Sequence, residues 1–435
     1  MHAVLGHHFL QAHEPALQMA GQPDHRTTRH RDSRPRCIPM SITPLRNASQ
    51  AASGSPVRPG SPAFSALLNR LGEEFAGRAA HYDRSGEFPR ENFQRLHQEG
   101  LLALTIPLSQ GGLGGGLAEA VEAIGAVAKG DPSTALILAM QYLHHNRLQD
   151  NPQWPEALRQ RVVREAVEDG ALINALRVEP ALGSPSRGGL PATVARRTPE
   201  GWRISGSKLY STGSHGLTWC NVFARSDDAD PLVGVWLIRK DSPGIRIVED
   251  WDHLGMRATC SHRIDFDDVL VPLEHAVNVA PASRKSTETE LDPEGLLWMG
   301  ALLGALYDGV ARAARDWLVD WLKQRTPSAL GAPLASLPRL QQLVGEIDSL
   351  LLVNRSLLDA AVDRRLPIGA SGQLKHLVTD NAIRVVELAL QASGNHGLSK
   401  NNSLERHYRD VLCGRIHTPQ SDVVLVKAGQ AALGL

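Results

Sequence analysis

Three histidines stand where an imidazole could do acid–base chemistry. His417 comes directly before Thr418-Pro419, and the proline is expected to end one helix and open the next, which makes a rigid corner. His144 and His145 lie in the mostly apolar run STALILAMQYLHHNRLQD, which predicts a buried helix. An imidazole changes charge near neutral pH, so each histidine is a candidate acid or base. Because a core histidine more often serves packing alone, both interpretations stay open here.

The segments that must position these histidines are helical. Apolar residues recur at helical spacing from Pro62 to about Gly170, and Asp131-Pro132-Ser133 has the residue types of a helix start. Helical periodicity returns in the last third of the chain, in five segments at about 293–324, 338–363, 373–393, 403–416 and 420–433. Segments of this length and spacing predict an antiparallel helix bundle.

Between the helical parts, the period of the apolar residues changes from 3.6 to 2. Short β-rich runs such as GWRISGSKLYST and SHRIDFDDVLVP, separated by turn residues, extend from Ala171 to about Val277. The sequence therefore predicts an α+β protein, mostly α. We expect an N-terminal helical domain at 61–170, a middle antiparallel β barrel or sandwich at 171–280, and a C-terminal helical bundle at 281–435.

Residues 1–60 differ from the rest in composition. They are rich in His, Arg, Pro and Ser with little apolar periodicity, so we expect a disordered extension. An arginine-rich, acid-poor beginning is also typical of a mitochondrial presequence. The interpretation we favour is an upstream-extended reading frame in which Met40 is the true start, because no clear amphipathic helix is present.

Charge and cysteine content exclude several classes of protein. Lys and Arg together number 46, as do Asp and Glu, which gives no indication of a nucleic-acid or anionic membrane partner. The four cysteines have no metal-ligand spacing, and the longest uncharged apolar run, Leu296 to Tyr307, is too short to span a bilayer. We expect a cytoplasmic, soluble protein with reduced thiols and no metal centre.

Four motifs in a fixed order carry a resemblance over residues 62–435. They are FPRENFQRLHQEGLLALTIPLSQGGLG, WRISGSKLYSTG, PGIRIVEDWDHLGMRATCSHRIDFDDVLVP and LQASGNHG followed by LERHYRD. Through these four motifs, the sequence resembles the acyl-CoA dehydrogenase superfamily of flavoproteins. The resemblance implies that family's order of helical domain, β domain and helical bundle, and a bound flavin, either FAD or FMN.

The resemblance also implies residues that would contact the flavin. Tyr210 and Thr212 would lie along the isoalloxazine with Thr212 near N5, and Ser211 stands between them, where strand alternation would turn it to the other side. Asn174 lies at the β-domain edge where some members have polar side chains. Ser184 ends the run VEPALGS. The matching run in the family contacts the flavin and the thioester, and its first residue carries a hydroxyl, whereas the first residue here is valine.

Three further positions match residues that contact the flavin nucleotide in relatives, and one of them does so across a subunit boundary. Arg325 matches an arginine that contacts a neighbouring subunit's flavin pyrophosphate, and Gln391 and Gly394 match the loop that supports the adenosine portion. The resemblance thus implies a homotetramer, or a homodimer, with flavin near the subunit interface.

The departure from the family pattern lies at the corner after LERHYRD. In the dehydrogenases a catalytic glutamate stands eight residues beyond the Arg-Asp pair, and here that position is Thr418. Some members carry the glutamate on the first bundle helix instead, where Glu294 is the candidate. The alternative is that Asp292-Pro293-Glu294 is only a helix start, because acids are favoured at the positive end of the helix dipole.

A second branch of the superfamily, which includes dibenzothiophene monooxygenase-like and amine N-hydroxylase-like proteins, uses reduced flavin and oxygen. Its chemistry needs neutral proton donors rather than a base, and His417 with His144 or His145 could supply them. We slightly favour this monooxygenase-like interpretation, with a small-molecule substrate and a flavin reductase as partner. The alternatives are an acyl-CoA dehydrogenase with Glu294 as base, served by an electron-transfer flavoprotein, and a flavin-binding protein without catalysis.

Overall fold

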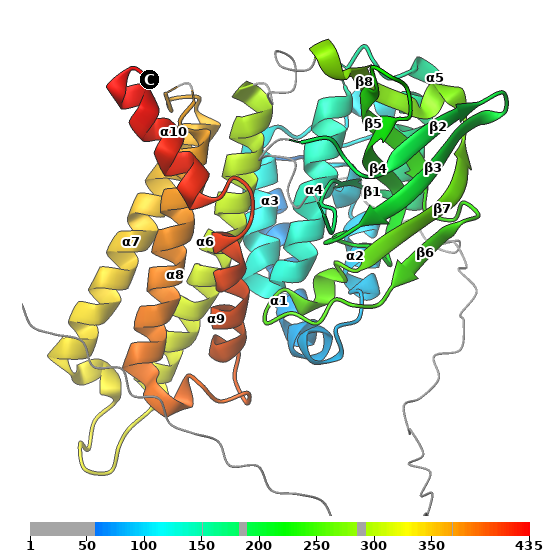
Figure 1. Ribbon diagram of the computed structural model, residues 1–435. Coiled ribbons are helices and arrows are strands. Elements are labelled where there is room, and N and C mark those ends of the chain that lie inside the picture. The colour runs from blue at the N-terminus through cyan, green and yellow to red at the C-terminus, as the bar shows by residue number, and fades with distance from the viewer. Residues whose placement is uncertain (1–56, 150, 182–188, 285–292, 368) are drawn as a thin grey trace, which may run out of the picture. The chain divides into compact units, whose positions relative to one another are not determined.

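The computed structural model describes residues 57–149, 151–181, 189–284, 293–367 and 369–435. The expected extension at 1–60, apart from its last four residues, lies outside these ranges, as do Ser184 and Asp292. The predicted fold class is confirmed, with helices at both ends and a sheet between them (Figure 1). The exact domain limits stay a prediction.

The N-terminal part consists of helices that begin where the sequence indicates. They are α1 (Pro62–Ser85), α2 (Arg90–Gln98), α3 (Leu117–Gly130), α4 (Pro132–Leu148) and α5 (Glu156–Asp169). Asp131 is the N-cap of α4, since its carboxylate accepts a hydrogen bond from the Ser133 N–H at 3.1 Å. The Asn92 amide of α2 donates to the same carboxylate at 3.2 Å, which fixes the start of α4 against its neighbour.

The middle part is one eight-stranded sheet. Its strands are β1 (Leu172–Leu176), β2 (Val194–Thr198), β3 (Gly201–Lys208), β4 (Leu217–Ser226), β5 (Leu232–Arg239), β6 (Ile245–Val248), β7 (Arg263–Val271) and β8 (Ala276–Pro281). Seven follow the order β6-β7-β3-β2-β4-β5-β8, and β1 pairs with β4 outside this path. The sheet is mixed rather than wholly antiparallel, because β1 and β2 both run parallel to β4. Strand periodicity predicts that these segments are strands, but it says nothing of their direction.

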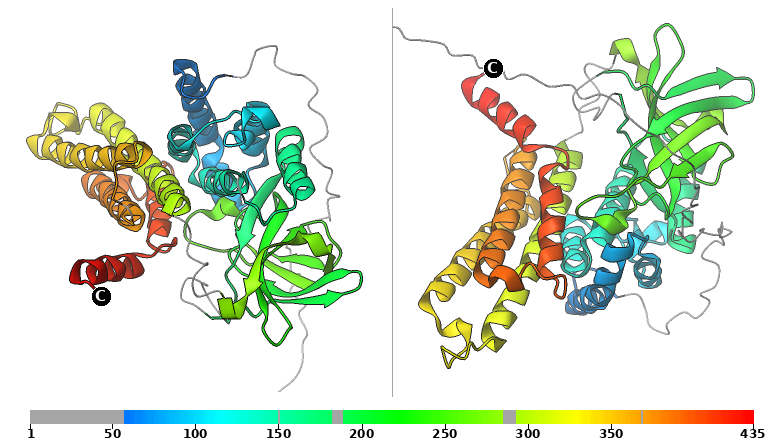
Figure 2. Two further views of the ribbon diagram at one scale, coloured as in Figure 1. Left: turned by 90° about the horizontal axis from the view of Figure 1, so that it is seen from above. Right: turned by 60° about the horizontal axis from the view of Figure 1, so that its bottom comes forward.

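The C-terminal part is the predicted bundle. It contains α6 (Pro293–Gln324), α7 (Pro338–Val362), α8 (Ser371–Ser393), α9 (Leu404–Leu412) and α10 (Ser421–Leu433). In both views of Figure 2 the N-terminal helices lie between this bundle and the sheet, and α3 and α4 pack on α6 while α4 also packs on β1. No helix in the described ranges is long and apolar enough to cross a bilayer.

A single side chain ties α4 to the sheet. The Gln141 amide is fully buried, donates to Ala171 O at 3.0 Å and accepts from the Ile173 N–H at 2.9 Å. Both partners flank the start of β1, so the second half of α4 is held directly over that strand. Three and four residues further along α4 come His144 and His145.

Helix α9 is fixed by charged groups in a nearly dry contact. Arg409 pairs with Asp83 at the end of α1 at 2.7 Å and donates to Leu254 O at 3.0 Å. The buried carboxylate of Asp410 accepts the Met256 N–H at 2.7 Å. A Cβ on Gly255 would lie 2.3 Å from Arg409 O, so only glycine permits this approach. The helix that precedes His417 is thereby locked to both α1 and the segment before β7.

This contact predicts a pH dependence of stability. Burial raises the pKa of Asp410 from about 3.8 to about 7, so its contribution is fully present below pH 4 and is lost as pH rises through 7. Asp410→Asn keeps an acceptor for the Met256 N–H without the charge. From pH 5 to pH 8, urea unfolding should show the free energy of unfolding of Asp410→Asn rising relative to that of the parent by about 2–3 kcal/mol. Asp252→Asn, which removes an exposed carboxylate, should show no such trend; equal slopes in both variants would contradict the assignment.

Candidate functional site

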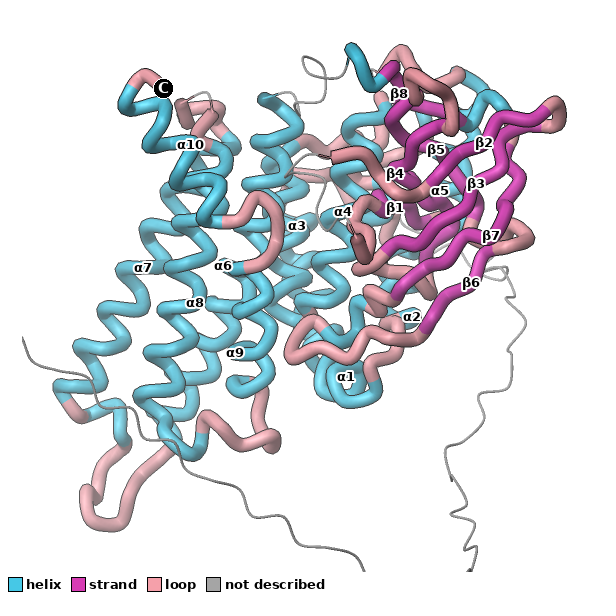
Figure 3. Tube along the Cα trace, viewed as in Figure 1, coloured by secondary structure: helices cyan, strands magenta, loops and turns pink. Residues whose placement is uncertain are grey.

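The loop that joins α9 to α10, pink in Figure 3, contains His417, which is held by two hydrogen-bonding supports. The Tyr307 hydroxyl on α6 bonds to His417 Nδ1. The ammonium of Lys375 on α8 donates to Gly414 O and to His417 O, each at 2.7 Å. Lys375 is 1% exposed and Tyr307 is fully buried, so both supports are rigid. The corner predicted from Thr418-Pro419 is thus held by residues from two other helices.

The surroundings keep this imidazole neutral and select its tautomer. Burial, with a smaller effect from the Lys375 charge, lowers the pKa of His417 to about 4. Burial raises the pKa of Tyr307 well above its usual value, so its hydroxyl keeps its proton. In the described part of the chain, His417 is the one hydrogen-bond partner of that hydroxyl, which therefore donates to Nδ1. The proton of the imidazole then resides on Nε2, where it is available to a ligand.

The two histidines of α4 are also neutral. His144 Nδ1 lies 3.2 Å from the Asn221 amide of β4, and burial, followed by the charge of Arg147, lowers its pKa to about 3. His145 is 1% exposed, and neither ring nitrogen has a partner among the described residues. Burial lowers the pKa of His145 to about 4. A buried imidazole without partners is costly unless a ligand or water satisfies it, so His145 keeps its place as a candidate.

The segment after β3 places a group of hydroxyls beside β1. Thr212 Oγ1 lies 3.0 Å from Ser261 Oγ, and the Asn174 amide donates to Thr212 O at 3.0 Å. Tyr210 is 54% exposed and has a left-handed φ of 53°, an uncommon conformation for a bulky residue. Ser211 is fully buried, and its hydroxyl bonds Lys208 O at 3.4 Å. Asn174, Tyr210 and Thr212 therefore line one edge, while the Ser211 side chain faces the interior.

Aromatic side chains flank this edge. The ring of Trp251 stacks on His253 with centroids 3.6 Å apart, and the Tyr210 ring stands edge-on to both at about 6 Å. This group was not predicted from sequence, although the motif VEDWDHLGMR contains two of its members. It offers a flat apolar surface next to the hydrogen-bonding groups of Thr212 and Asn174.

A nearby cluster has the residue types of a metal site. Ligand atoms of His215, Cys260 and His262 all lie within 4.8 Å of one another. However, the Cys260 thiol donates to Gly86 O at 3.2 Å, and burial raises its pKa to about 12. The Trp251 N–H donates to His262 Nδ1, which keeps the proton on the other ring nitrogen. Hydrogen bonds within the chain therefore account for this cluster, and we assign it no metal.

Glu294 lies in a different environment from the histidines. It is in the first turn of α6, it is half exposed, and it pairs with Arg364 and accepts from Trp298 Nε1 at 2.7 Å. Thirteen residues separate it from Tyr307 on the same helix, which is about 20 Å of helix rise. The structure does not bring Glu294 and His417 together. Its role as a base stays a prediction, and in this structure its carboxylate is held by Arg364 and Trp298 at the start of the helix.

The three residues expected near a neighbouring subunit gather at the far end of the bundle. Arg325 follows the last turn of α6 and is exposed, while Gln391 and Gly394 end α8. The rings of Trp321 and His396, 5.4 Å apart, bring these two helix ends together. Gln391 also lines a surface hollow of about 230 Å³ between α7 and α8. These residues lie together, but away from His417 in the same chain.

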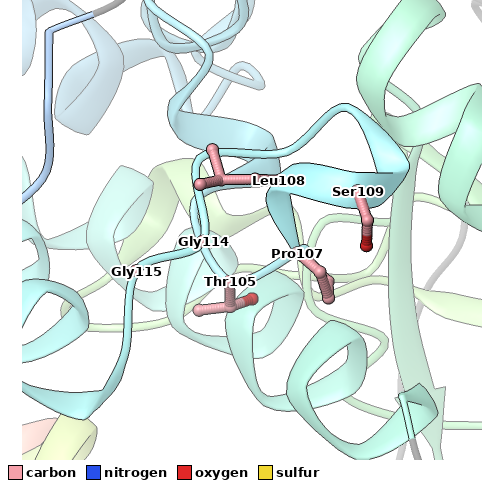
Figure 4. Close-up of a pocket in the computed structure, with 6 residues that line it drawn as sticks. All are labelled: Thr105, Pro107, Leu108, Ser109, Gly114 and Gly115. Atoms are coloured by element: carbon pink, nitrogen blue, oxygen red, sulfur yellow. The ribbon is translucent and has the colours of Figure 1, made fainter.

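A larger hollow opens beside the loop before α3. It has a volume of about 490 Å³ and is lined by Thr105, Pro107, Leu108, Ser109, Gly114 and Gly115 (Figure 4). Thr105 Oγ1 lies 3.5 Å from Tyr142 O of α4, so the hollow borders the helix that carries the paired histidines. It contains no ionisable side chain and offers a place for a ligand rather than a catalytic group.

Comparison with known proteins identifies the family. Models of the N-terminal, middle and C-terminal domains of acyl-CoA dehydrogenases match residues 67–149, 178–269 and 301–421. The YdbM protein of Bacillus subtilis, whose name assigns it provisionally to the acyl-CoA dehydrogenases, is 35% identical over 84% of this chain and 95% of its own. The chain belongs to the acyl-CoA dehydrogenase family. It is accordingly a flavin-dependent oxidoreductase, with FAD or FMN as cofactor.

Other relatives are named for a different reaction. L-evernosamine nitrososynthase from a Micromonospora species is 29% identical over 88% of this chain and 92% of its own. The structure of KijD3 in complex with FMN and dTDP-3-amino-2,3,6-trideoxy-4-keto-3-methyl-D-glucose is similar with a TM-score of 0.72. It is 28% identical and covers 88% of this chain and 97% of its own. The family membership predicted from the four motifs is confirmed. The relatives include proteins named as acyl-CoA dehydrogenases and proteins named as nitrososynthases.

The described residues fit a flavin at the edge formed by Asn174, Tyr210 and Thr212. A flavin needs an apolar face and hydrogen-bonding groups along its edge. The half-exposed Tyr210 ring supplies the first, and the Thr212 hydroxyl and nearby backbone supply the second. Tyr307, Lys375 and Asn221, which orient the histidines, were missed in the sequence because nothing local distinguishes them.

The tautomer of His417 can be tested without any substrate. In ¹⁵N-labelled protein at pH 7, the His417 signals, assigned by loss in His417→Ala, should show a neutral ring protonated at Nε2. Tyr307→Phe removes the donor to Nδ1, so the ring should become a mixture of tautomers. Tyr142→Phe is the control, because it truncates another buried hydroxyl that has no partner among the described residues. An unchanged spectrum in Tyr307→Phe would contradict the proposed support.

Proposed function

We propose that this protein uses reduced flavin and oxygen to oxidise a small molecule, as a monooxygenase-type member of its family. The observation that carries the proposal is the turn after α9, where a neutral His417 is clamped by Tyr307 and Lys375 and the dehydrogenase glutamate position is Thr418. Two helices hold an imidazole at the corner from which a dehydrogenase would project its base.

The surroundings of Glu294 give less support to dehydrogenation. Removal of an α proton needs a carboxylate in a dry site, where its basicity is raised by desolvation. Glu294 is half exposed to water and paired with Arg364, so it does not lie in the dry surroundings that this step needs. The name of the 35% identical relative favours acyl-CoA dehydrogenation. Glu294 therefore remains the residue to be tested as the base of that reaction.

The histidines supply what an oxygen reaction requires of the protein. The bound reduced flavin provides the electrons that activate oxygen. His417 can donate a hydrogen bond from its Nε2–H to a developing negative charge, since its imidazole is neutral at physiological pH. His144 and His145 are neutral as well, so these three side chains place no competing positive charge beside the reacting atoms.

The relatives named as nitrososynthases support an oxidation that does not involve a thioester. A nitroso group carries an oxygen on nitrogen, and L-evernosamine nitrososynthase is named for making one. We infer a non-thioester substrate for this chain also, and a flavin reductase as the source of reduced flavin. We propose that the far end of the bundle with Arg325, Gln391 and Gly394 meets a second subunit in a homodimer or homotetramer, in the cytoplasm.

Thr212 provides a first test of the flavin site. Thr212→Val keeps the shape but removes a hydroxyl that is 3.0 Å from Ser261 Oγ. If that hydroxyl also bonds the flavin, the free energy of flavin binding should weaken by about 1–2 kcal/mol, measured by flavin fluorescence titration. The control is Thr198→Val in β2, whose hydroxyl bonds Gly201 O in the hairpin to β3. Equal affinity in the Thr212 variant and the parent would place the flavin elsewhere.

The reaction type is decided by comparing His417→Ala with Glu294→Gln. The protein loaded with reduced FMN is mixed with oxygen, and the absorbance of oxidised flavin is followed. In the parent protein this absorbance should return only after a delay. His417→Ala should shorten the delay by about tenfold or more and raise hydrogen peroxide release, because the donor is lost. Glu294→Gln should match the parent.

The dehydrogenase alternative predicts the opposite pattern. Anaerobic mixing of the oxidised protein with butyryl-CoA would bleach the flavin, and Glu294→Gln would lower that rate by about 10²-fold or more. Such a result would overturn the proposal. A protein that neither delays flavin oxidation nor is bleached would be a flavin-binding protein without catalysis.

A further inference from the structure

An arginine lies on the sheet face beside the paired histidines. In the parallel register of β1 and β4, Ala175 stands opposite Asn221 and Leu176 opposite Val222, so Arg177 follows on the same face as Asn221. Its guanidinium lies against the ring of Phe223, with Cζ 4.8 Å from the centroid. Stacking on an aromatic ring holds a guanidinium in place without using its hydrogen-bond donors.

Helix α4 brings two more basic groups to the same face. His144 bonds to Asn221 at 3.2 Å, and Arg147 follows one turn later on the same side of the helix. Burial, followed by the charge of Arg147, lowers the pKa of Arg177, and burial, with smaller effects from the charges of both arginines, lowers the pKa of His144. Arg147, Arg177 and His144, which we call the basic patch, are therefore close enough to influence one another.

The carboxylate nearest to Arg177 in sequence does not neutralise it. Glu179 is buried, and its oxygens accept from Lys208 at 2.5 Å, from the Thr193 hydroxyl at 2.6 Å and from the Ala192 N–H at 2.6 Å. Arg177 makes no hydrogen bond or ion pair with a described residue, so none of these residues occupies its five N–H donors. A preoriented guanidinium that no described carboxylate neutralises, beside a second arginine, favours a negatively charged ligand.

We propose that the basic patch binds an anionic group, a phosphate or carboxylate, of a ligand that lies between α4 and the outer face of β1 and β4. Arg177 receives the anion through its paired N–H groups, and Arg147 adds to the positive field. The link to the flavin edge runs through His144: the side chain of Asn174 raises the pKa of His144 against the effect of burial, and its amide donates to Thr212 O at 3.0 Å. The inference rests on the proposed function in that the anion belongs to the flavin or to the substrate of the same site.

The experiment measures binding, so it does not depend on turnover. Arg177→Met removes the guanidinium but keeps an apolar stem on Phe223, and Arg196→Met is the control, because Arg196 is an exposed arginine of β2 paired with Asp268. FMN and riboflavin, which lacks the phosphate, are titrated into the flavin-free parent and variants by fluorescence. Inorganic pyrophosphate is titrated into the FMN-loaded proteins by calorimetry.

Two results support the proposal and separate the sources of the anion. If the flavin phosphate occupies the site, Arg177→Met weakens FMN by about tenfold or more and leaves riboflavin unchanged. If a substrate anion occupies it, both flavins bind as in the parent, and pyrophosphate binding to the loaded parent is lost in Arg177→Met. Arg196→Met should match the parent in each case.

Other results overturn it. The inference fails if two results occur together. The FMN-loaded parent binds no pyrophosphate, and the ratio of FMN affinity to riboflavin affinity is the same in the parent and in Arg177→Met. It also fails if Arg196→Met shows the same losses, because the effect is then general charge. Should Arg177→Met not fold, Arg177→Lys tests the same ratios, since it keeps the charge but loses the paired donors and should give the same pattern at smaller size. A failure of the oxygen reaction would leave these binding ratios unaffected.

Discussion

The bond between the Asp410 carboxylate and the Met256 N–H fixes the relation between the bundle and the segment that precedes β7. It lies in a dry contact where water cannot substitute for either partner, and Gly255 allows the backbones to approach to van der Waals distance. Arg409 extends the contact to α1 through Asp83. Helix α9 therefore cannot move without breaking several buried bonds, and the turn that carries His417 inherits that rigidity.

Burial explains why the three candidate histidines are neutral. Desolvation disfavours the imidazolium, and neighbouring Lys375 and Arg147 add repulsion at His417 and His144. A neutral imidazole can donate one hydrogen bond and accept another, whereas an ionised carboxylate can only accept. In the proposed function, a neutral imidazole next to Thr418 offers a hydrogen-bond donor where a dehydrogenase has a base.

Positive charge around β1 is distributed unequally. Lys208 is buried with Glu179, so the two charges offset each other inside the sheet and little external field remains. Arg177 lies close by without a carboxylate partner among the described residues. The segment that follows β1 thus holds Glu179 in a closed ion pair with Lys208 of β3, whereas Arg177, two residues earlier, lies against the ring of Phe223.

Local sequence patterns were sufficient for the elements of the fold. Pro132 after Asp131 indicated the start of α4, and the periodic run at 293–324 coincides with α6. Both signals are local, since a helix depends on its own cap and its own apolar stripe. Strand direction was not predictable in this way: β1 and β2 run parallel to β4 because the connections between distant strands decide pairing.

The sequence by itself determined the family, through four motifs in order, and showed Thr418 in place of a glutamate. Only the tertiary structure decided which groups surround His417. The acceptors of Lys375 lie about forty residues further along the chain, and Tyr307 is 110 residues from its histidine. A buried lysine or tyrosine has no local signature, because its value depends on partners that only folding brings within hydrogen-bonding distance.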